Sequence, residues 1–395
     1  MTRSTSRATD RDRWLKSGAP SAKHREAQVE ALREVIESGI LQDPTGGPKA
    51  TELETAFADY IGVAHAVGVN SGTAALSCAL VALGVGPGHE VIVPALTFVA
   101  SATAATLAGA TPVFCDVDER TLCIDVDDAR RRITPRTKAV MPVHLLGYPS
   151  DMERVVALAR EHGLAVIEDC CQGHGAIVGD AKVGSIGDVG CFSFSKRHLI
   201  SVGGGGIVTT DDPELADRLR RVSFHGIADM DQLWTNFRDY DVRGFNFGMS
   251  ELFAALALLD VPRLDAYLER RREIARIYDH VLAGLDDLDP LADPEHGVPC
   301  HHNYALRLRQ GARTKRDWLA DELRKEGVTL LVNLVPLTRT TAFAPTAGDS
   351  GPCPVSESLG DRLIVLELDH NWSSAEGEEQ ASRVRSAVER STQTV

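Results

Sequence analysis

The sequence lacks long apolar runs and an excess of positive charge. No stretch of 18 consecutive apolar residues occurs, so a membrane-spanning helix is not expected. Lysine and arginine number 42 against 56 aspartates and glutamates, which gives a formal net charge of −14 at pH 7. A nucleic-acid-binding protein needs a basic face, and we expect no such binding. The opening residues, MTRSTSRATDRDR, have no apolar core of a signal peptide, so we expect a cytoplasmic protein.

The cysteines lack the spacing of metal-binding or disulfide-bonded proteins. The chain has no CxxC pair and no cluster of four thiols, so we predict neither a zinc nor an iron–sulfur site. Most cysteines lie within apolar runs, where the reduced thiol packs as a small hydrophobic group. The eight are Cys78, Cys115, Cys123, Cys170, Cys171, Cys191, Cys300 and Cys353. We therefore predict no bound metal.

The chain has 395 residues, enough for two domains of ordinary size. Residues 1–25 are predicted to be a flexible N-terminal segment. Residues 26–255 are predicted to form a large α/β domain. Residues 256–395 are predicted to form a long connecting helix and a small α+β domain.

Strand-like and helical segments alternate along the large domain. Short apolar runs predict strands at residues 65–69, 90–93, 112–117, 140–144, 165–168, 190–194 and 206–210. Helical spacing predicts helices at residues 27–39, 72–83, 99–107 and 151–162, and one long helix from Gly248 to about residue 285. This alternation indicates an α/β fold with a mainly parallel sheet.

Ligands of an open parallel sheet bind beyond the carboxyl ends of its strands. Three predicted loops there carry polar groups. Residues 70–75, NSGTAA, begin a helix and suit an anion, although an ordinary helix cap explains them as well. Glu168 and Asp169 end an apolar strand. Residues 191–198, CFSFSKRH, are followed by four glycines. A phosphate cradle, a strand-end aspartate and a later lysine and histidine, in this order, indicate pyridoxal phosphate.

The motifs around these loops point to one family of pyridoxal phosphate enzymes. From about Leu41 onward the chain resembles the DegT/DnrJ/EryC1/StrS family, sugar aminotransferases of the pyridoxal phosphate fold type I class. The matching motifs are NSGTAAL (70–76), EVIVPALTFVASA (90–102), PVHLLGYPSDM (142–152), IEDCCQGHGA (167–176), GDVGCFSFS (187–195) and GFNFGMSELFAA (244–255). The resemblance implies a homodimer whose two active sites each borrow residues from the partner.

The resemblance also implies which residues hold the cofactor's phosphate. Gly72 and Thr73 match the phosphate-binding turn, and Ser193 matches a phosphate-binding hydroxyl. Asn246 matches an asparagine that reaches the phosphate from the neighbouring subunit. Without the resemblance, simple packing would explain both Asn246 and Phe98.

Three further matches concern the pyridine ring. Phe98 takes the place of the aromatic side chain that stacks on the ring. Asp169 matches the carboxylate that pairs with the protonated ring nitrogen, which keeps the ring an electron acceptor. Gln172 matches the residue on the ring's hydroxyl side.

The catalytic lysine is where the chain departs from the family. In family aminotransferases the lysine that binds the cofactor covalently lies five residues after the serine equivalent to Ser193, and here that position is His198. Lys196 reaches the position only with a deletion followed by an insertion, so we favour His198. Histidine forms no such link, but it serves as a base. The same replacement marks a branch of the family, the 3-dehydratases of 4-keto-6-deoxy sugars, which hold pyridoxamine phosphate.

Other positions also depart from the dehydratase branch or the family. The segment from Gln172 to Gly175 is closer to the aminotransferases. Gly204 replaces a usual acidic residue, Gly248 a usual arginine, and Asn333 a common histidine. These changes indicate that the substrate side of the pocket has diverged.

Three hypotheses follow. The first is a pyridoxamine-phosphate-dependent dehydratase with His198 as base, and the second is an aminotransferase with Lys196 bound to the cofactor. The third is an inactive cofactor-binding subunit. The expected substrate is a keto sugar, nucleotide sugar, nucleoside-linked sugar or cyclitol in deoxy- or amino-sugar biosynthesis. Its expected co-reactant is an amino donor such as glutamate or glutamine, or a separate reductase.

Overall fold

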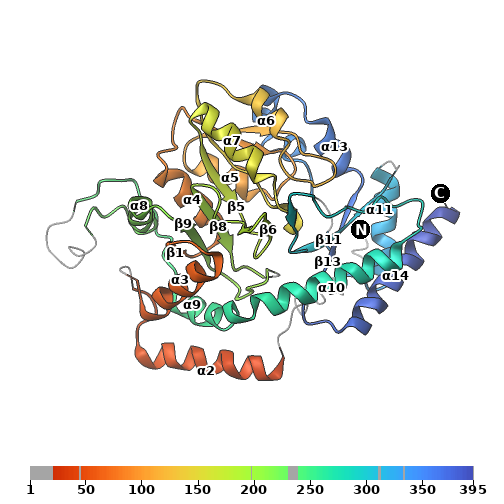
Figure 1. Ribbon diagram of the computed structural model, residues 1–395, viewed down its shortest axis with the longest axis horizontal. Helices are drawn as coiled ribbons and strands as arrows, with labels where there is room; N and C mark the ends of the chain where they lie inside the picture. Colours follow the sequence, from red (N-terminus) through yellow and green to blue (C-terminus); the bar gives the residue numbers. More distant parts are fainter. Residues whose placement is uncertain are drawn as a thin grey trace, which may run out of the picture.

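Seven short apolar segments form the central sheet of the computed structural model, which describes residues 21–43, 46–196, 198–229, 239–309, 313–331 and 334–394. The strand order is β1-β9-β8-β5-β4-β2-β3 (Figure 1). β9 runs antiparallel to both neighbours, and the other adjacent pairs are parallel. The bounds are β1 (His65–Val69), β2 (Glu90–Pro94), β3 (Thr111–Cys115), β4 (Thr137–Val140), β5 (Ala165–Asp169), β8 (Val189–Ser193) and β9 (Gly206–Thr210). The predicted α/β fold with a mainly parallel sheet is confirmed.

The predicted strand at residues 140–144 is wrong in its bounds, because β4 ends at Val140. Proline has no N–H to donate to a ladder, so regular pairing does not continue through Pro142. The carbonyl of Pro142 instead accepts the N–H of Asp169 at 2.9 Å, and the N–H of His144 bonds the carbonyl of Asp169 at 3.1 Å. The chain therefore leaves the sheet beside the end of β5.

Helices cover both faces of the sheet, as the alternating side chains of the strands require. Val91 and Val93 of β2 pack toward α4 (Gly72–Ala82) and α5 (Ala100–Leu107), whereas Ile92 packs toward the opposite face. The helix α8 (Pro213–Ser223) shares the face of α4. The opposite face is covered by α3 (Pro48–Ile61), α6 (Val126–Arg132), α7 (Met152–His162) and α9 (Glu251–Leu258).

The helix predicted from Gly248 to about residue 285 is interrupted in the structure. It consists of α9, a short 3-10 turn η3 (Val261–Arg263) and α10 (Leu264–Leu282). Pro262 lies in the interruption, and a proline inside a helix removes one backbone hydrogen bond and crowds the preceding turn. The break redirects α10 beneath the sheet and toward the C-terminal part of the chain (Figure 1).

The C-terminal part has its own small antiparallel sheet. β13 (Leu363–Glu367) lies between β11 (Asn303–Arg307) and β12 (Leu330–Leu331). This sheet shares an apolar core with α10, α11 (Arg313–Lys325) and α14 (Ser374–Thr394). The shorter elements are η1 (Leu145–Gly147), β6 (Ile177–Val178), β7 (Ala181–Lys182), β10 (Gly297–Val298), η4 (Leu337–Arg339), α12 (Ala344–Ser350) and α13 (Pro354–Gly360). The division into domains at residues 255 and 256 remains a prediction.

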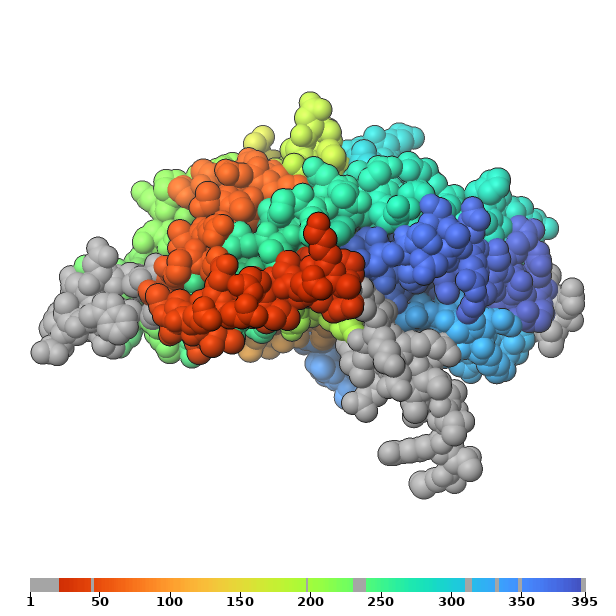
Figure 2. Space-filling view, turned by 90° about the horizontal axis from the view of Figure 1, so that it is seen from below, coloured from red at the N-terminus to blue at the C-terminus, as the bar shows by residue number. Residues whose placement is uncertain are grey.

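The first described helix, α2 (Ala22–Ser38), begins earlier than the predicted residue 27. Its start is set by Ser21, whose side chain accepts the N–H of His24 at 3.2 Å. Figure 2 shows α2 lying across the outer surface of the molecule. Residues 1–20 of the predicted flexible segment lie outside the described residues. Within the described parts of the chain, no helix is long and apolar enough to cross a membrane.

Candidate active site

The sheet order brings the three polar loops of the sequence together. β1 and β8 both flank β9, and β5 lies beside β8, so the loops that follow β1, β5 and β8 meet at one edge of the sheet. Ser71 begins α4, and its side chain accepts the N–H of Ala74 at 3.1 Å. The free N–H groups of a helix start bind anions. The predicted phosphate cradle therefore lies beside the strand-end aspartate.

Gly72 is the point where these loops pack most closely. A Cβ atom on Gly72 would lie 2.7 Å from Cβ of Ser193 and 2.8 Å from Sγ of Cys171. Glycine is therefore required here, because any side chain would push the start of α4 away from the ends of β8 and β5. Thr73, the next residue, is partly exposed and lies on the same helix start.

Replacing Gly72 by alanine is expected to weaken binding of pyridoxal phosphate about 10- to 100-fold. An overpacked contact of this kind costs about 1–3 kcal/mol, and each 1.4 kcal/mol is a tenfold change in affinity. Absorbance titration of the purified protein with the cofactor measures the effect. Gly86→Ala is the matched control, because its Cβ would meet only the carbonyl oxygen of Ala108 at 3.8 Å. Equal affinities of the two variants would contradict the cradle.

Asp169 ends β5 and is held in place by hydrogen bonds to both carboxylate oxygens. Its Oδ2 accepts the hydroxyl of Ser101 at 2.7 Å, and its Oδ1 accepts the N–H of Cys171 at 3.2 Å. The residue is only 4% exposed. A buried carboxylate fixed in this way suits a cationic ring nitrogen, because the low local dielectric strengthens the pairing.

Gln172 and Phe98 lie on loops next to this aspartate. Oε1 of Gln172 accepts the N–H of Leu146 at 2.7 Å, so the other end of the amide, Nε2, is the donor atom for a ligand. Phe98 follows β2, and 62% of it is exposed. An exposed aromatic ring at the carboxyl end of a strand is available to stack on a ligand.

Asn246 lies beside the start of α4 in the same chain. Its carbonyl oxygen accepts Nδ2 of Asn70 at 3.4 Å, and its backbone forms an isolated bridge with Phe224. The contact to Asn70 holds Asn246 at the edge of the cradle. Its role toward a neighbouring subunit remains a prediction.

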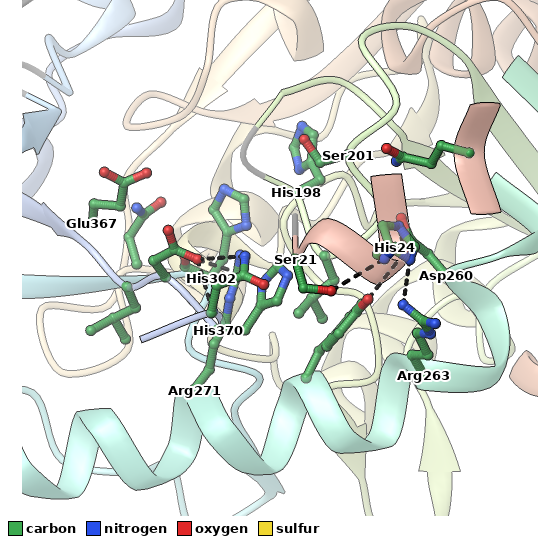
Figure 3. A pocket seen from close by; sticks show the side chains of 17 residues that line it. Ser21, His24, His198, Ser201, Asp260, Arg263, Arg271, His302, Glu367 and His370 are labelled. Atoms are coloured by element: carbon green, nitrogen blue, oxygen red, sulfur yellow. Dashed lines mark hydrogen bonds and ion pairs between the residues drawn. The ribbon is translucent and has the colours of Figure 1, made fainter. Parts of the chain in front are cut away.

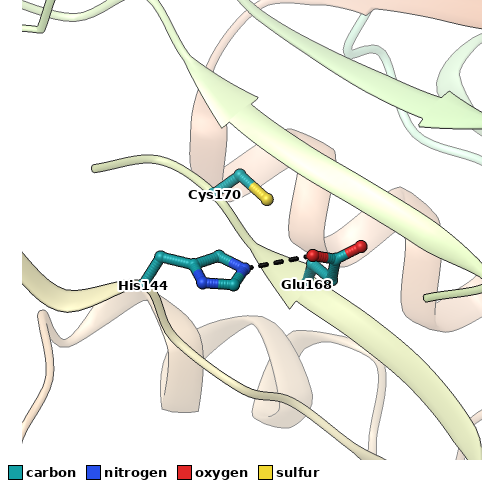
Figure 4. A group of neighbouring side chains, drawn as sticks. All are labelled: His144, Glu168 and Cys170. Carbon is teal, nitrogen blue, oxygen red and sulfur yellow. Dashed lines mark hydrogen bonds and ion pairs between the residues drawn. The ribbon is translucent and has the colours of Figure 1, made fainter. Parts of the chain in front are cut away.

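Glu168, the other member of the acidic pair, points away from the candidate site. It is fully buried and accepts the backbone N–H groups of Gly184 at 2.9 Å, Ile186 at 2.8 Å and Gly187 at 2.7 Å. Nε2 of His144 lies 3.1 Å from its carboxylate (Figure 4). Burial acts to raise the pKa of Glu168, but hydrogen bonds from His144 and the backbone hold that pKa below its ordinary value.

His144, Glu168 and Cys170 also lie close enough to hold a metal ion. Two observations explain the cluster without one. Nδ1 of His144 accepts the N–H of Ser150 at 3.1 Å, so Nε2 carries the proton and donates to Glu168. Burial raises the pKa of the Cys170 thiol well above its ordinary value. The cluster therefore serves as a hydrogen-bonded anchor beneath the end of β5.

Replacing Glu168 by glutamine is expected to lower the free energy of unfolding by about 3 kcal/mol, because the amide offers donors to backbone N–H groups that need an acceptor. Since the folded pKa of Glu168 is lowered, its stabilising contribution is present above the unfolded pKa. It is lost as pH falls through the folded pKa. Urea unfolding at pH 7 measures the loss. Glu161→Gln, which breaks an exposed ion pair with Arg130, should lower the free energy of unfolding far less, because water and salt screen exposed charges. Equal losses would contradict the anchor.

The loop between β8 and β9 holds Lys196 and His198. The N–H of Ser195 bonds Oγ of Ser193 at 3.3 Å, and the N–H of His198 bonds the carbonyl of Ser195 at 3.3 Å. His198 turns inward: its ring stacks on His302 with centroids 4.9 Å apart, and it lies 5.8 Å from the ring of His174. Lys196 is partly exposed. Arg197, between them, lies outside the described residues.

His198 is neutral at physiological pH. Burial and the nearby Arg271 guanidinium lower the pKa of His198 to about 3. A hydrogen bond with the backbone of Cys171 acts in the opposite direction and raises this pKa, but its effect is smaller. Nδ1 of His198 is buried and has no hydrogen-bond partner among the described residues. The ring is therefore in the protonation state that a base requires, and an anionic ligand nearby would raise its pKa.

The structure explains one of the divergent glycines. A Cβ atom on Gly204 would lie 2.7 Å from the ring of Phe253, so the acidic residue usual at this position would not fit. At Gly248 the carbonyl oxygen accepts Nε2 of Gln42 at 3.3 Å. Asn333 lies outside the described residues.

Arg271 is a residue near the site that the sequence analysis missed. It is 2% exposed, and Nη1 donates to the carbonyl of His302 at 3.2 Å. With His198 and His302 it lines a cavity of ≈ 200 Å³ beneath the β8–β9 loop (Figure 3). The signal was an arginine within the apolar stripe of α10, formed by Leu264, Leu268, Ala275, Tyr278 and Leu282.

Comparison with known proteins identifies the family. The family model described as the DegT/DnrJ/EryC1/StrS aminotransferase family matches residues 22–389. The chain belongs to this family. It is 40% identical over 374 residues to a UDP-N-acetyl-3-dehydro-alpha-D-glucosamine 3-aminotransferase of Acidithiobacillus ferrooxidans, covering 92% of this chain and 95% of the relative. It is also 41% identical over 312 residues to GDP-perosamine synthase of Caulobacter vibrioides, and the match covers 78% of this chain and 82% of that relative.

A solved structure of the family agrees with the architecture. DesV of S. venezuelae, solved in complex with a ketimine intermediate, superposes with a TM-score of 0.85 at 34% identity and covers 93% of this chain and 96% of its own. The protein is thus an enzyme of fold type I, and its cofactor is pyridoxal phosphate or pyridoxamine phosphate. This finding goes against an inactive subunit. The cradle at Gly72 and the fixed carboxylate of Asp169 fit such a cofactor.

Proposed function

We propose that the protein is a pyridoxamine-phosphate-dependent dehydratase of a keto sugar, with His198 as the base. The observation that carries the proposal is the place of His198. Its ring bonds the backbone of Cys171, two residues after Asp169, and it occupies the loop that follows Ser193. A neutral histidine that bonds the backbone of Cys171 supplies a proton acceptor without supplying the amine that an aminotransferase needs.

The chain would hold the cofactor through the cradle and the fixed carboxylate. Gly72, Thr73 and Ser193 would bind the phosphate, and Asp169 would keep the ring nitrogen protonated. Gln172 would meet the hydroxyl side of the ring, and Phe98 would cover its face. When bound, pyridoxamine phosphate supplies an amine that condenses with a ketone and a ring that accepts electrons.

His198 would act at two atoms in turn. It would take a proton from the carbon that bears the cofactor's amine, and it would give that proton to the neighbouring hydroxyl of the sugar as this group leaves as water. The same ring thus serves as base and then as acid, and proton balance is kept within the site. The buried, unpartnered Nδ1 of His198 allows the ring to change protonation state without breaking another hydrogen bond within the described structure.

The alternative is an aminotransferase in which Lys196 bonds the cofactor. The names of the relatives favour it, since the Acidithiobacillus protein is named an aminotransferase. It requires the partly exposed Lys196, rather than the inward His198, to reach the cofactor. An amino donor such as glutamate or glutamine would then restore the amine.

The proposed substrate is a nucleotide-linked keto sugar, and a nucleoside-linked sugar or cyclitol remains an alternative. Two relatives carry a UDP-linked and a GDP-linked sugar in their names, which supports this class. We also propose that the protein works as a cytoplasmic homodimer with shared sites, in which Asn246 reaches the neighbouring cofactor. If glutamate does not regenerate the aminated cofactor, we propose that a separate reductase acts with the dehydratase.

Mass spectrometry of the products tests the proposal. The purified enzyme is incubated with pyridoxamine phosphate and a panel of nucleotide-linked 4-keto sugars, with and without glutamate. A dehydratase yields a product that has lost one hydroxyl oxygen from the sugar and gained no nitrogen. A product in which nitrogen replaces the ketone oxygen would establish the aminotransferase instead.

A further inference from the structure

His302 is the side chain that lies flat against the proposed base. The ring centroids of His198 and His302 are 4.9 Å apart, and the ring planes differ by only 28°. His302 is 7% exposed and comes from the segment just before β11. His301, its neighbour, turns the other way and makes an edge contact with Tyr148 at 5.8 Å. The two adjacent histidines therefore point apart, at a turn where His301 has a left-handed backbone with φ of 47°.

The backbone of His302 is itself held rigidly. A Cβ atom on Gly147 would lie 2.5 Å from the backbone nitrogen of His302, so this segment packs directly on the glycine's backbone. Nη1 of Arg271 donates to the carbonyl of His302, and Nδ2 of Asn303 donates to the carbonyl of Leu366 at 3.3 Å. Because both the backbone nitrogen and the carbonyl of His302 are held, its side chain can restrain the ring that packs against it.

Several groups face His198 from the elements around it. His174 approaches from the loop after β5, His302 from the segment before β11 and Arg271 from α10, while Lys196 lies on the same loop as His198. The guanidinium of Arg271 opposes a positive charge on His198. The ring of His302 fills the space on one face of the imidazole, which limits its rotation.

We propose that His302 is a positioning residue for His198: its stacked ring fixes the orientation in which the histidine base meets its proton. The importance of that orientation rests on the proposed function. A planar ring at position 302 is sufficient for this role, whereas a proton at position 302 is not required. The contact is between faces of the rings, so no proton passes through it.

The test combines a spectroscopic and a kinetic readout. Histidine labelled with ¹³C is incorporated into the full chain, and the His198 resonance is identified by its loss in His198→Asn, since the chain has 13 histidines. In His302→Ala we expect the His198 resonance to broaden or split, and kcat to fall about 100-fold with KM unchanged. In His302→Phe the sharp resonance and most of kcat should return. His302→Leu serves if the alanine variant does not fold.

His370→Ala is the matched control. His370 lines the same cavity, but its ring packs on Tyr267 at 4.2 Å. Its removal should leave the His198 resonance unchanged. An unchanged His198 resonance in His302→Ala would overturn the inference, as would a rise in KM alone in both the alanine and phenylalanine variants, which would mark a substrate contact. Full activity of His198→Asn would instead refute the proposed function, while the resonance in the cofactor-free protein would still report on the stacking.

Discussion

Replacing His198 by asparagine lowers kcat about 1,000-fold, whereas replacing Lys196 by methionine leaves kcat within a few fold. General acid–base catalysis by one side chain contributes about 10²- to 10⁴-fold, and asparagine keeps the polarity and approximate size without the basic nitrogen. The proposed dehydratase has no use for an amine at position 196. Steady-state kinetics on the keto-sugar substrate, with pyridoxamine phosphate in excess, measures both values.

The two variants are matched because both lie on the loop between β8 and β9, so damage to the loop would affect them alike. Circular dichroism and cofactor affinity establish that each variant is folded and loaded. The opposite pattern, with Lys196→Met inactive and His198→Asn active, would refute the dehydratase and favour the aminotransferase.

Replacing Asp169 by asparagine is expected to lower kcat about 100- to 1,000-fold with a smaller change in cofactor affinity. The amide keeps the shape of the carboxylate but not its charge, so the ring nitrogen loses the partner that favours its protonated form. Loss of one fixed electrostatic contact at a reaction centre has an effect of this size. Rapid kinetics and absorbance titration separate turnover from binding.

Asp188→Asn is the control for Asp169→Asn. Asp188 binds the N–H of Val166 at 2.7 Å, near the opposite end of the β5–β8 strand pair, so it tests damage to the same strands away from the site. Similar losses in the two variants would indicate a structural role for Asp169. Such a result would remove the carboxylate from the proposed chemistry.

The sequence predicted most strands of the central sheet because the signals for them are local. Strands such as β1 and β9 have the predicted bounds, since an apolar run between turn residues specifies both ends. The predicted bounds of β4 were wrong because the end of a strand depends on its hydrogen-bond partners. Pro142 has no N–H to donate, and its carbonyl oxygen accepts the N–H of Asp169. The break at η3 was missed although Pro262 was visible, because the apolar periodicity continues on both sides of it.

The residues of the candidate site that belong to family motifs could be predicted from the sequence. Those whose role depends on packing between distant segments could not. The family motifs identified Gly72 and Asp169, and the structure gives each a reason in a close approach and a hydrogen-bonded carboxylate. The role of Glu168 as an anchor required the positions of three distant N–H groups. The stack of His198 on His302 joins residues about a hundred positions apart, and no periodicity reveals such a contact.

Borohydride reduction of the protein with pyridoxal phosphate, followed by peptide mapping by mass spectrometry, determines whether Lys196 bonds the cofactor. If His198 is the base, we expect no phosphopyridoxyl group on Lys196, and cofactor that is bound before denaturation and released intact after it. His198→Asn should behave the same way. A phosphopyridoxyl group on Lys196 would refute the dehydratase, because that lysine would then occupy the place assigned to His198.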